Sequence, residues 1–154
     1  MKTKIRSAVI ADVKHIHAIL GHFAKEGLLL GRSISSIYDK LRDFAVCVDE
    51  NDQVLGVCAL QIIWEDLAEI RSLAVLPDYH GLRIGSRLVA WCLDQADYFG
   101  IGKVFALTYQ AVFFEKHGFH HISKNELPHK IWSDCINCPM FPDCNEEAMM
   151  IDRK

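Results

Sequence analysis

A strand that passes through a short glycine-bearing loop directly into an amphipathic helix constrains this chain most. Residues 67–76 are largely β-prone and end at Pro77-Asp78, and the following loop contains Gly81 and Gly85. Apolar residues then recur at helical spacing until Gly100. Free backbone N–H groups at the start of a helix attract anions, and glycine lets the main chain approach a ligand closely. The segment therefore predicts a turn that can hold a phosphate group.

The residues of this loop leave two interpretations open. Arg83 and Arg87 would add positive charge beside the turn, which favours a phosphate ligand. Gly81 and Gly85 could equally serve only as turn and helix-cap residues. The spacing matches neither the P-loop nor the dinucleotide-binding fingerprint.

The order of the other elements excludes an all-parallel sheet. Patterning predicts a hairpin of Phe44–Val48 and Val54–Trp64 across the Asn51-Asp52 turn. A mixed sheet with helices on both faces is the natural packing for this order. The expected strands are 4–10, 44–48, 54–64, 67–76, 103–108, a short one after Phe119, and 148–151; the expected helices are 12–27, 33–41, one of about 14 residues before Gly100, and 111–117.

Composition narrows the class of protein further. With 154 residues, 51% of them hydrophobic and 24% charged, we expect one globular domain over residues 1–154. The net charge of −3 argues against a nucleic-acid partner. No apolar run is long enough for a secretory signal or a membrane span, so we expect a cytoplasmic protein with reduced thiols and no membrane partner. Cys47, Cys58 and Cys92 lie in apolar segments and are interpreted as core residues.

A cysteine-rich tail segment at about 127–147 carries the other three cysteines. Cys135, Cys138 and Cys144 supply three thiols of a possible structural zinc site, for which His129 or His121 would be the fourth ligand. Three thiols are an incomplete zinc signature, so reduced structural thiols and a redox pair remain alternatives.

Two segments resemble the GNAT N-acetyltransferases. His80-Gly81-Leu82-Arg83-Ile84-Gly85 is similar to their acetyl-CoA pyrophosphate loop, with His80 in place of the usual Arg or Gln and Arg83 in place of the first glycine. Residues 111–119 are similar to their second CoA-side motif. The resemblance covers roughly residues 3–122 and implies an α/β (α+β) GNAT fold with a mixed, mostly antiparallel central sheet.

Three further segments resemble the acetyltransferase part of bacterial N-acetylglutamate synthases. They are residues 27–33, 64–75 and 127–132. This resemblance implies transfer of an acetyl group from acetyl-CoA to the α-amine of L-glutamate, the first step of arginine biosynthesis. Many of those synthases carry an additional amino-acid-kinase domain, for which this chain is too short, so we expect a stand-alone form.

The resemblance also assigns roles to residues. Glu69 is the expected general base, because a carboxylate on this strand often serves that role in the superfamily. Phe114 stands where many relatives have a proton-donating Tyr, so Thr108 and Tyr109 are the candidates to protonate the leaving thiolate. The alternatives are that both hydroxyls are structural and that water supplies the proton. The expected acetyl-CoA contacts are Leu73, Ala74, Val75, His80, Gly81, Leu82, Arg83, Ile84, Gly85, Ser86 and Phe113.

Cations are expected to bind the carboxylates of glutamate. Arg32 is the first candidate, because the resemblance places its loop beside the acceptor site, and Arg71 and then Lys130 follow it. A guanidinium is the best side-chain partner for a carboxylate. The two-residue period of a strand predicts that Glu69, Arg71 and Leu73 share one face.

Two other functions remain open from the sequence. The chain could acetylate another amine, such as a different amino acid, a polyamine or a protein N-terminus. It could also be a non-catalytic CoA-binding or zinc-linked interaction module. A homodimer is expected only by analogy with other GNAT proteins.

Overall fold

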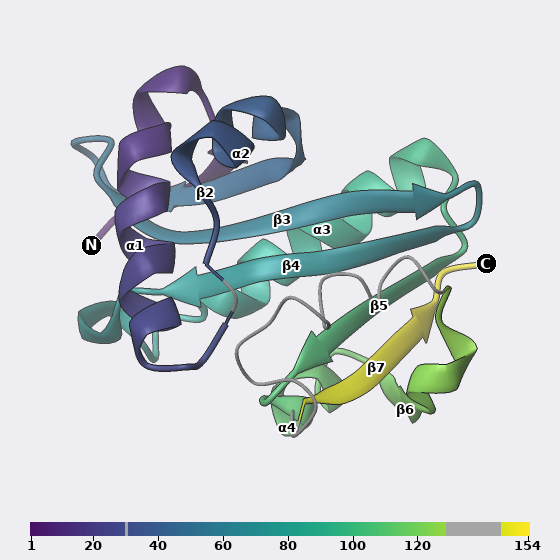
Figure 1. Cartoon of the computed structure of the whole chain (residues 1–154). Helices are drawn as coiled ribbons and strands as arrows, with labels where there is room; N and C mark the ends of the chain where they lie inside the picture. Colours follow the sequence, from purple (N-terminus) through teal and green to yellow (C-terminus); the bar gives the residue numbers. More distant parts are fainter. Residues whose placement is uncertain (30, 129–145) are drawn as a thin grey trace.

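The computed structural model describes residues 1–29, 31–128 and 146–154, and its centre is a seven-stranded sheet (Figure 1). The strand order is β1-β2-β3-β4-β5-β7-β6, and only the β4–β5 pair is parallel. The expected mixed, mostly antiparallel sheet is therefore confirmed. The strands are β1 (Lys4–Ser7), β2 (Phe44–Val48), β3 (Val54–Trp64), β4 (Leu67–Val75), β5 (Lys103–Thr108), β6 (His120–Ile122) and β7 (Glu147–Asp152).

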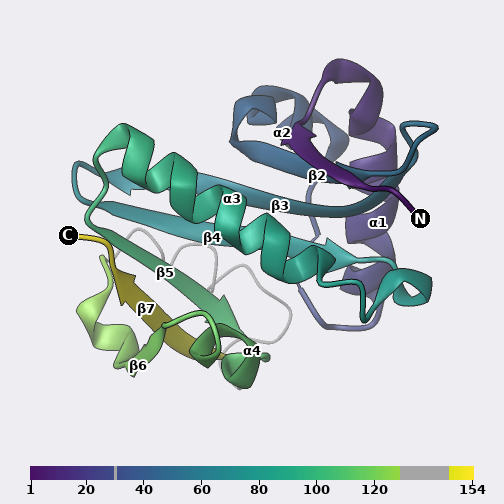
Figure 2. The ribbon, with the colours of Figure 1, turned by 180° about the vertical axis from the view of Figure 1, so that it is seen from behind.

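Helices cover both faces of the sheet, as expected. Figure 1 shows α1 (Val13–Lys25) and α2 (Ile34–Asp39) in front of the sheet, and Figure 2 shows α3 (Ile84–Phe99) across the opposite face. The short helix α4 (Ala111–Glu115) contributes Ala111 and Phe114 to the core on the α3 side. Four short 3-10 helices complete the described elements: Ile10–Asp12, Leu41–Asp43, Pro77–Tyr79 and Lys124–Glu126.

Local sequence explains where these helices begin and end. The Ser33 hydroxyl accepts a hydrogen bond from the Ser36 N–H at 3.1 Å and caps the N-terminus of α2. Helix α3 ends at Gly100, which takes the left-handed conformation (φ 79°) that glycine adopts without steric cost. Both boundaries follow from residue types visible in the sequence.

An extra residue in β4 changes the face on which its side chains lie. Ala59 of β3 pairs with Arg71 and Val57 pairs with Ala74, so two residues of β4, Ser72 and Leu73, oppose the single residue Cys58 of β3. Ser72 lies in this β-bulge with a φ of 57°. Ala74 consequently packs in the core under α1, whereas Leu73 packs against the core under α3.

The expectation that Leu73 shares a face with Glu69 and Arg71 is therefore wrong. Ile70 lies in the core under α3, and Glu69 and Arg71 alternate with it onto the opposite face. The bulge at Ser72 then shifts the alternation by one residue and turns Leu73 to the α3 side.

The parallel strands β4 and β5 separate part of the way along. Their pairing runs from Leu67 with Lys103 to Glu69 with Phe105, and no later pair is formed between these two strands. Both strands nevertheless continue, β4 to Val75 and β5 to Thr108, and Figure 1 shows them diverging. The divergence leaves main-chain groups of both strands facing a gap in the sheet.

The interpretation of three cysteines as core residues is confirmed. Cys47, Cys58 and Cys92 are free thiols with no exposed surface. The Cys58 and Cys92 sulfurs lie 3.5 Å apart, and this hydrogen bond together with burial raises the pKa of the Cys58 thiol. A protonated buried thiol is a poor nucleophile, so these cysteines contribute packing. In the part of the chain that the structure describes, no helix is both long enough and apolar enough to cross a membrane.

Candidate active site

A cavity of about 820 Å³ occupies the gap between β4 and β5. The C-terminal end of α1 and the residues just after it form one wall, and the loop before α3 forms the far end. The ends of β5 and α4 complete the lining. Fourteen residues singled out from the sequence line it: Glu69, Arg71, Leu73, Ala74, Val75, His80, Gly81, Arg83, Ile84, Gly85, Ser86, Thr108, Tyr109 and Phe113.

Three other expected site residues stand apart from this lining. Leu82 is exposed on the loop and does not line the cavity. Arg32 also lies outside the lining: it donates hydrogen bonds to the Ser36 hydroxyl, and its guanidinium lies 5.1 Å from the centre of the Phe44 ring. Lys130 lies outside the described residues.

The far end of the cavity is the N-terminus of α3. Arg83 is its N-cap residue and accepts the first helical hydrogen bond, from Arg87 N at 3.0 Å. The N–H groups of Ile84, Gly85 and Ser86 precede that bond and have no partner within the helix. Among the described residues, no side chain caps this end. This geometry is suited to an anion, which is one of the two interpretations that the sequence left open.

Arg87 does not contribute to this end of the cavity, contrary to expectation. Its guanidinium donates to the Thr3 hydroxyl at 2.6 Å and to the Thr3 carbonyl at 3.2 Å, and so ties the residue before β1 to α3. The physical reason lies one turn earlier. Arg83 has a left-handed conformation (φ 60°) outside the regular helix, so the four-residue spacing does not put Arg83 and Arg87 on one face.

Side chains on both sides of the loop hold it in place. The His80 Nε2 lies 2.8 Å from the carbonyl oxygen of Val75, at the end of β4. The His117 Nε2 lies 3.0 Å from the Ser86 hydroxyl and so connects α4 to the first turn of α3. Burial lowers the pKa of His117, so its ring is neutral near pH 7.

The other end of the cavity contains a carboxylate beside a guanidinium. Glu69 is 7% exposed, and its Oε1 lies 3.8 Å from Arg71 Nε. The Arg71 Nη1 donates to Gln61 Oε1 at 2.8 Å, across the β3–β4 pair. A carboxylate and a guanidinium thus lie together where β4 begins to leave β5.

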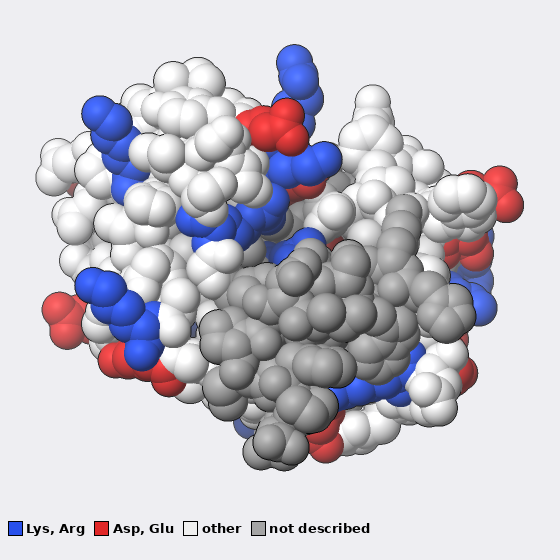
Figure 3. Space-filling view, viewed as in Figure 1, with Lys and Arg blue, Asp and Glu red and all other residues white. Residues whose placement is uncertain are grey.

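Further charges surround this pair. Figure 3 shows Lys and Arg side chains gathered near the middle of the face that carries α1 and α2. Burial raises the pKa of Asp43, and the nearby Lys40, Arg32 and Arg71 act in the opposite direction. The end of the cavity that contains Glu69 and Arg71 therefore borders on a group of cations.

The ends of β5 and α4 carry the candidate proton donors. Thr108 is 8% exposed, and its hydroxyl accepts a hydrogen bond from Gln110 N at 2.7 Å. Phe114 is buried and packs edge-on against Phe113 and Phe119. Its ring carries no hydroxyl, so this position has no proton donor. Thr108 and Tyr109 both line the cavity.

Nothing in the described ranges supports a metal centre. No group of three His, Cys, Asp or Glu side chains among residues 1–29, 31–128 and 146–154 could hold a metal ion. His121 instead lies 2.8 Å from Glu115 and 3.7 Å from Glu147. The proposed ligands His129, Cys135, Cys138 and Cys144 lie outside the described part of the chain.

Sequence reasoning missed several residues of this site. Gln61 holds Arg71, and Ser72 forms the bulge, but neither stands out in an apolar strand pattern. The wall formed by Phe23, Ala24 and Gly27 was also missed. The stop signal at Gly27 showed where α1 ends but not which cavity this end faces.

Comparison with known proteins identifies the class. A family model described as an acetyltransferase (GNAT) domain matches residues 40–121. An uncharacterized N-acetyltransferase of Chlorobaculum tepidum is 41% identical over 148 residues, which are 96% of this chain and 95% of the relative. The chain therefore belongs to the GNAT family of acetyl-CoA-dependent N-acetyltransferases.

Two other relatives have more specific names. The amino-acid acetyltransferase of Mycobacterium tuberculosis is 31% identical over 132 residues, 84% of this chain and 75% of the relative. The structure of N-acetylglutamate synthase from Neisseria gonorrhoeae with coenzyme A and N-acetyl-glutamate has a TM-score of 0.90 at 28% identity. That match covers 100% of this chain and 36% of the Neisseria chain, so this chain spans about a third of that protein.

Proposed function

We propose that this protein transfers the acetyl group of acetyl-CoA to the α-amine of L-glutamate. The observation that carries the proposal is the buried Glu69 beside Arg71, in a cavity that continues between β4 and β5 to the N-terminus of α3. One end offers a base and a cation to an amino acid, and the other offers backbone N–H groups to a diphosphate.

The dimensions and chemistry of the cavity suit acetyl-CoA. The free N–H groups of Ile84, Gly85 and Ser86 would hold the diphosphate. Main-chain groups between Leu73 and Val75, where β4 has left β5, would pair with the pantetheine arm. The Phe113 ring lies close to Gly85, at the end of the cavity proposed for the diphosphate. A Cβ built onto Gly85 would lie 3.5 Å from this ring.

Glu69 would take a proton from the ammonium group of the acceptor, directly or through one water molecule. The free amine then attacks the thioester carbon, the new C–N bond forms, and the C–S bond breaks. Backbone N–H groups around Leu73 to Val75 would stabilise the negative charge that develops on the carbonyl oxygen.

The departing thiolate needs a proton. Thr108 and Tyr109 are the proposed donors, because both line the cavity at the end of β5 and Phe114 has no proton to give. The loss of turnover on replacing each of the two residues would rank them as donors. Water is the remaining source of the proton.

Arg71 is the first proposed partner for a carboxylate of the acceptor. It lines the cavity beside Glu69 and is oriented by Gln61. Arg32 and Lys130 are the other proposed partners. A pocket with cations favours an acidic amino acid over a polyamine.

The relatives support the same acceptor. The M. tuberculosis relative is called an amino-acid acetyltransferase, and the N. gonorrhoeae enzyme binds N-acetyl-glutamate, the product of this reaction. Acetylation of glutamate would place the protein at the first step of arginine biosynthesis.

The test is release of the CoA thiol from acetyl-CoA against a panel of amino acids, a polyamine and a peptide with a free N-terminus. We expect release that depends on glutamate, with N-acetylglutamate identified by mass spectrometry. Release with another amine and none with glutamate would assign a different acceptor. No release with any amine, despite measurable CoA binding, would favour the non-catalytic CoA-binding alternative.

A further inference from the structure

Few of the described residues that line the cavity are cations, although the proposed ligand carries several phosphate charges. Among the described residues that line it, Arg71 and Arg83 are the Lys and Arg side chains. Arg71 lies at the acceptor end and is engaged with Gln61. Arg83 therefore provides the guanidinium at the phosphate end.

Arg83 has an unfavourable backbone conformation. Its φ of 60° and ψ of 23° are left-handed, a region that disfavours side chains with a Cβ and that glycine enters freely. In this loop Gly81 has the same positive sign of φ, at 90°, without that cost. Residues in such conformations cluster at active sites and at sites that clamp a ligand.

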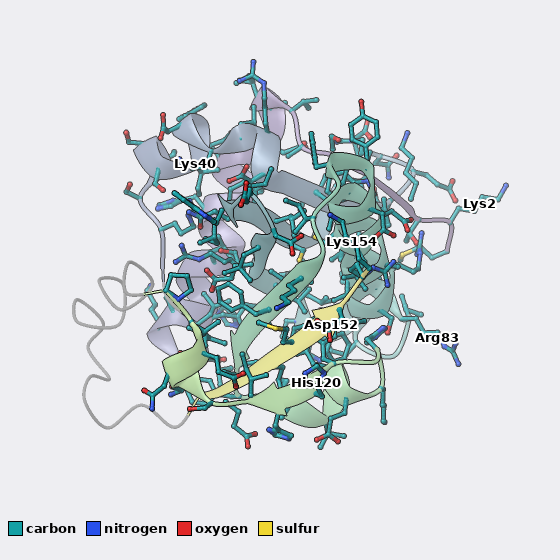
Figure 4. The ribbon with its side chains drawn as sticks, turned by 90° about the vertical axis from the view of Figure 1, so that its right-hand side faces the viewer. Lys2, Lys40, Arg83, His120, Asp152 and Lys154 are labelled. Carbon is teal, nitrogen blue, oxygen red and sulfur yellow. The ribbon has the colours of Figure 1, made fainter. Side chains whose placement is uncertain are left out.

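The side chain of Arg83 is placed to meet an anion outside the turn. Figure 4 shows it projecting into solvent from the loop that leads into α3. The neighbouring candidates are committed elsewhere: Arg87 binds Thr3, and the His80 ring lies against the Val75 carbonyl. Leu82 has no charge to offer.

Acetyl-CoA carries two kinds of phosphate. The diphosphate is internal and suits the N–H groups at the start of α3. The phosphate on the adenosine ribose is a terminal monoester with a charge near −2, and it lies farther out along the ligand. A guanidinium pairs with such a group through two parallel hydrogen bonds.

We propose that Arg83 binds the ribose 3′-phosphate and makes this protein select acetyl-CoA over cosubstrates that lack this group. The inference rests on the acetyl-CoA half of the proposed function and is independent of the acceptor. It gives the strained arginine a role that the backbone N–H groups of the turn do not fill.

The experiment measures equilibrium binding of CoA and of 3′-dephospho-CoA by calorimetry. The proteins are the wild type, Arg83→Gly and Arg83→Lys. Asp52→Gly is the matched control, because Asp52 has the same φ of 60° in the β2–β3 turn and does not line the cavity. Thermal unfolding of each variant shows whether the fold is kept.

We expect the wild type to bind CoA about tenfold more tightly than 3′-dephospho-CoA, a difference of about 1.4 kcal/mol. Arg83→Gly should bind the two ligands equally, at the affinity of the wild type for 3′-dephospho-CoA, without loss of thermal stability. Arg83→Lys should keep part of the preference, and Asp52→Gly all of it. The preference should shrink as salt is raised, because the pair is exposed.

Other outcomes overturn the inference. If Arg83→Gly weakens both ligands by the same factor, Arg83 binds the diphosphate instead. If the wild type binds both ligands equally, the ribose phosphate has no partner in the protein. If the wild type binds neither ligand, the acetyl-CoA half of the proposed function fails as well, and this result is distinct from the other two.

Discussion

The two halves of β4 differ in the chemical groups that they offer to the cavity. Before the bulge at Ser72, the strand pairs with β5 as far as Glu69 and turns Glu69 and Arg71 toward the end of the cavity proposed for the acceptor. After the bulge, it has left β5, and Leu73 and Val75 pack against the core under α3. Under the proposed function, the first half would therefore act on the acceptor through side chains, and the second half would bind acetyl-CoA through its main chain.

The largest expected effect comes from the side-chain half. Glu69→Gln keeps the shape of the side chain but cannot accept the proton of the amine, so we expect kcat to fall by about 10²–10⁴-fold. The KM for acetyl-CoA should remain within about twofold, because that substrate is proposed to bind along the other half of β4. Steady-state kinetics at saturating glutamate measures both values.

Glu69→Asp is the matched control for this experiment. It keeps a carboxylate on a shorter side chain, so part of the activity should remain. An unchanged kcat in Glu69→Gln would show that Glu69 is not the general base. It would also contradict the proposal that the first half of β4 acts through its side chains.

Arg71 tests the same half by binding rather than turnover. Arg71→Ala should raise the KM for glutamate by about 10–100-fold, the loss expected for a charge-assisted hydrogen bond. We expect a smaller rise for Arg32→Ala, because Arg32 stands outside the cavity lining and packs over Phe44. A larger effect of Arg32→Ala would move the carboxylate site away from β4.

A pair of glycines tests the phosphate end of the main-chain half. Gly81 has a φ of 90°, so Gly81→Ala should lower the free energy of unfolding by about 1–3 kcal/mol and raise the KM for acetyl-CoA. Gly85→Ala should change that KM by less than about threefold, since the added carbon would meet its nearest neighbours at ordinary contact distance, 3.5 Å. Equal effects of the two substitutions would mean that backbone conformation does not shape this turn.

The smallest effect concerns pH and the contact between His117 and Ser86. Burial lowers the pKa of His117 in the folded protein below its unfolded value of about 6.5, so protonation favours the unfolded chain. The free energy of unfolding should therefore decrease as the pH falls through about 6.5 and level off below the folded pKa. His117→Asn keeps a polar partner for Ser86 and should flatten part of this decrease in denaturant titrations from pH 7.5 to 5; an unchanged slope would contradict the assignment.

Much of the fold was predictable because each boundary has a local cause. Ser33 caps α2, Gly100 ends α3, and Asn51-Asp52 turns the β2–β3 hairpin. These signals depend on neighbouring residues, which the sequence displays directly.

The site was less predictable because its geometry depends on interruptions of regular structure. Strand periodicity carries straight through Ser72, so the bulge that turns Leu73 away is hidden in the sequence. Helical periodicity likewise predicts that Arg83 and Arg87 lie on one face. The left-handed conformation of Arg83 places it outside the regular helix, and Arg87 contacts Thr3 instead. Side-chain contacts across paired strands, such as that of Gln61 with Arg71, leave no mark on either segment alone.

The bulge at Ser72 provides the most direct test of the proposal that the two halves of β4 bind different substrates. Ser72→Val puts a β-branched residue at a φ of 57°, a conformation that such residues strongly disfavour. Glycine, introduced by Ser72→Gly, adopts this conformation without steric cost. We expect Ser72→Val to raise the KM for acetyl-CoA by at least about tenfold, with the KM for glutamate within about threefold of wild type, and Ser72→Gly to resemble the wild type in both. An unchanged KM for acetyl-CoA in a folded Ser72→Val protein, or a rise confined to glutamate, would contradict the account.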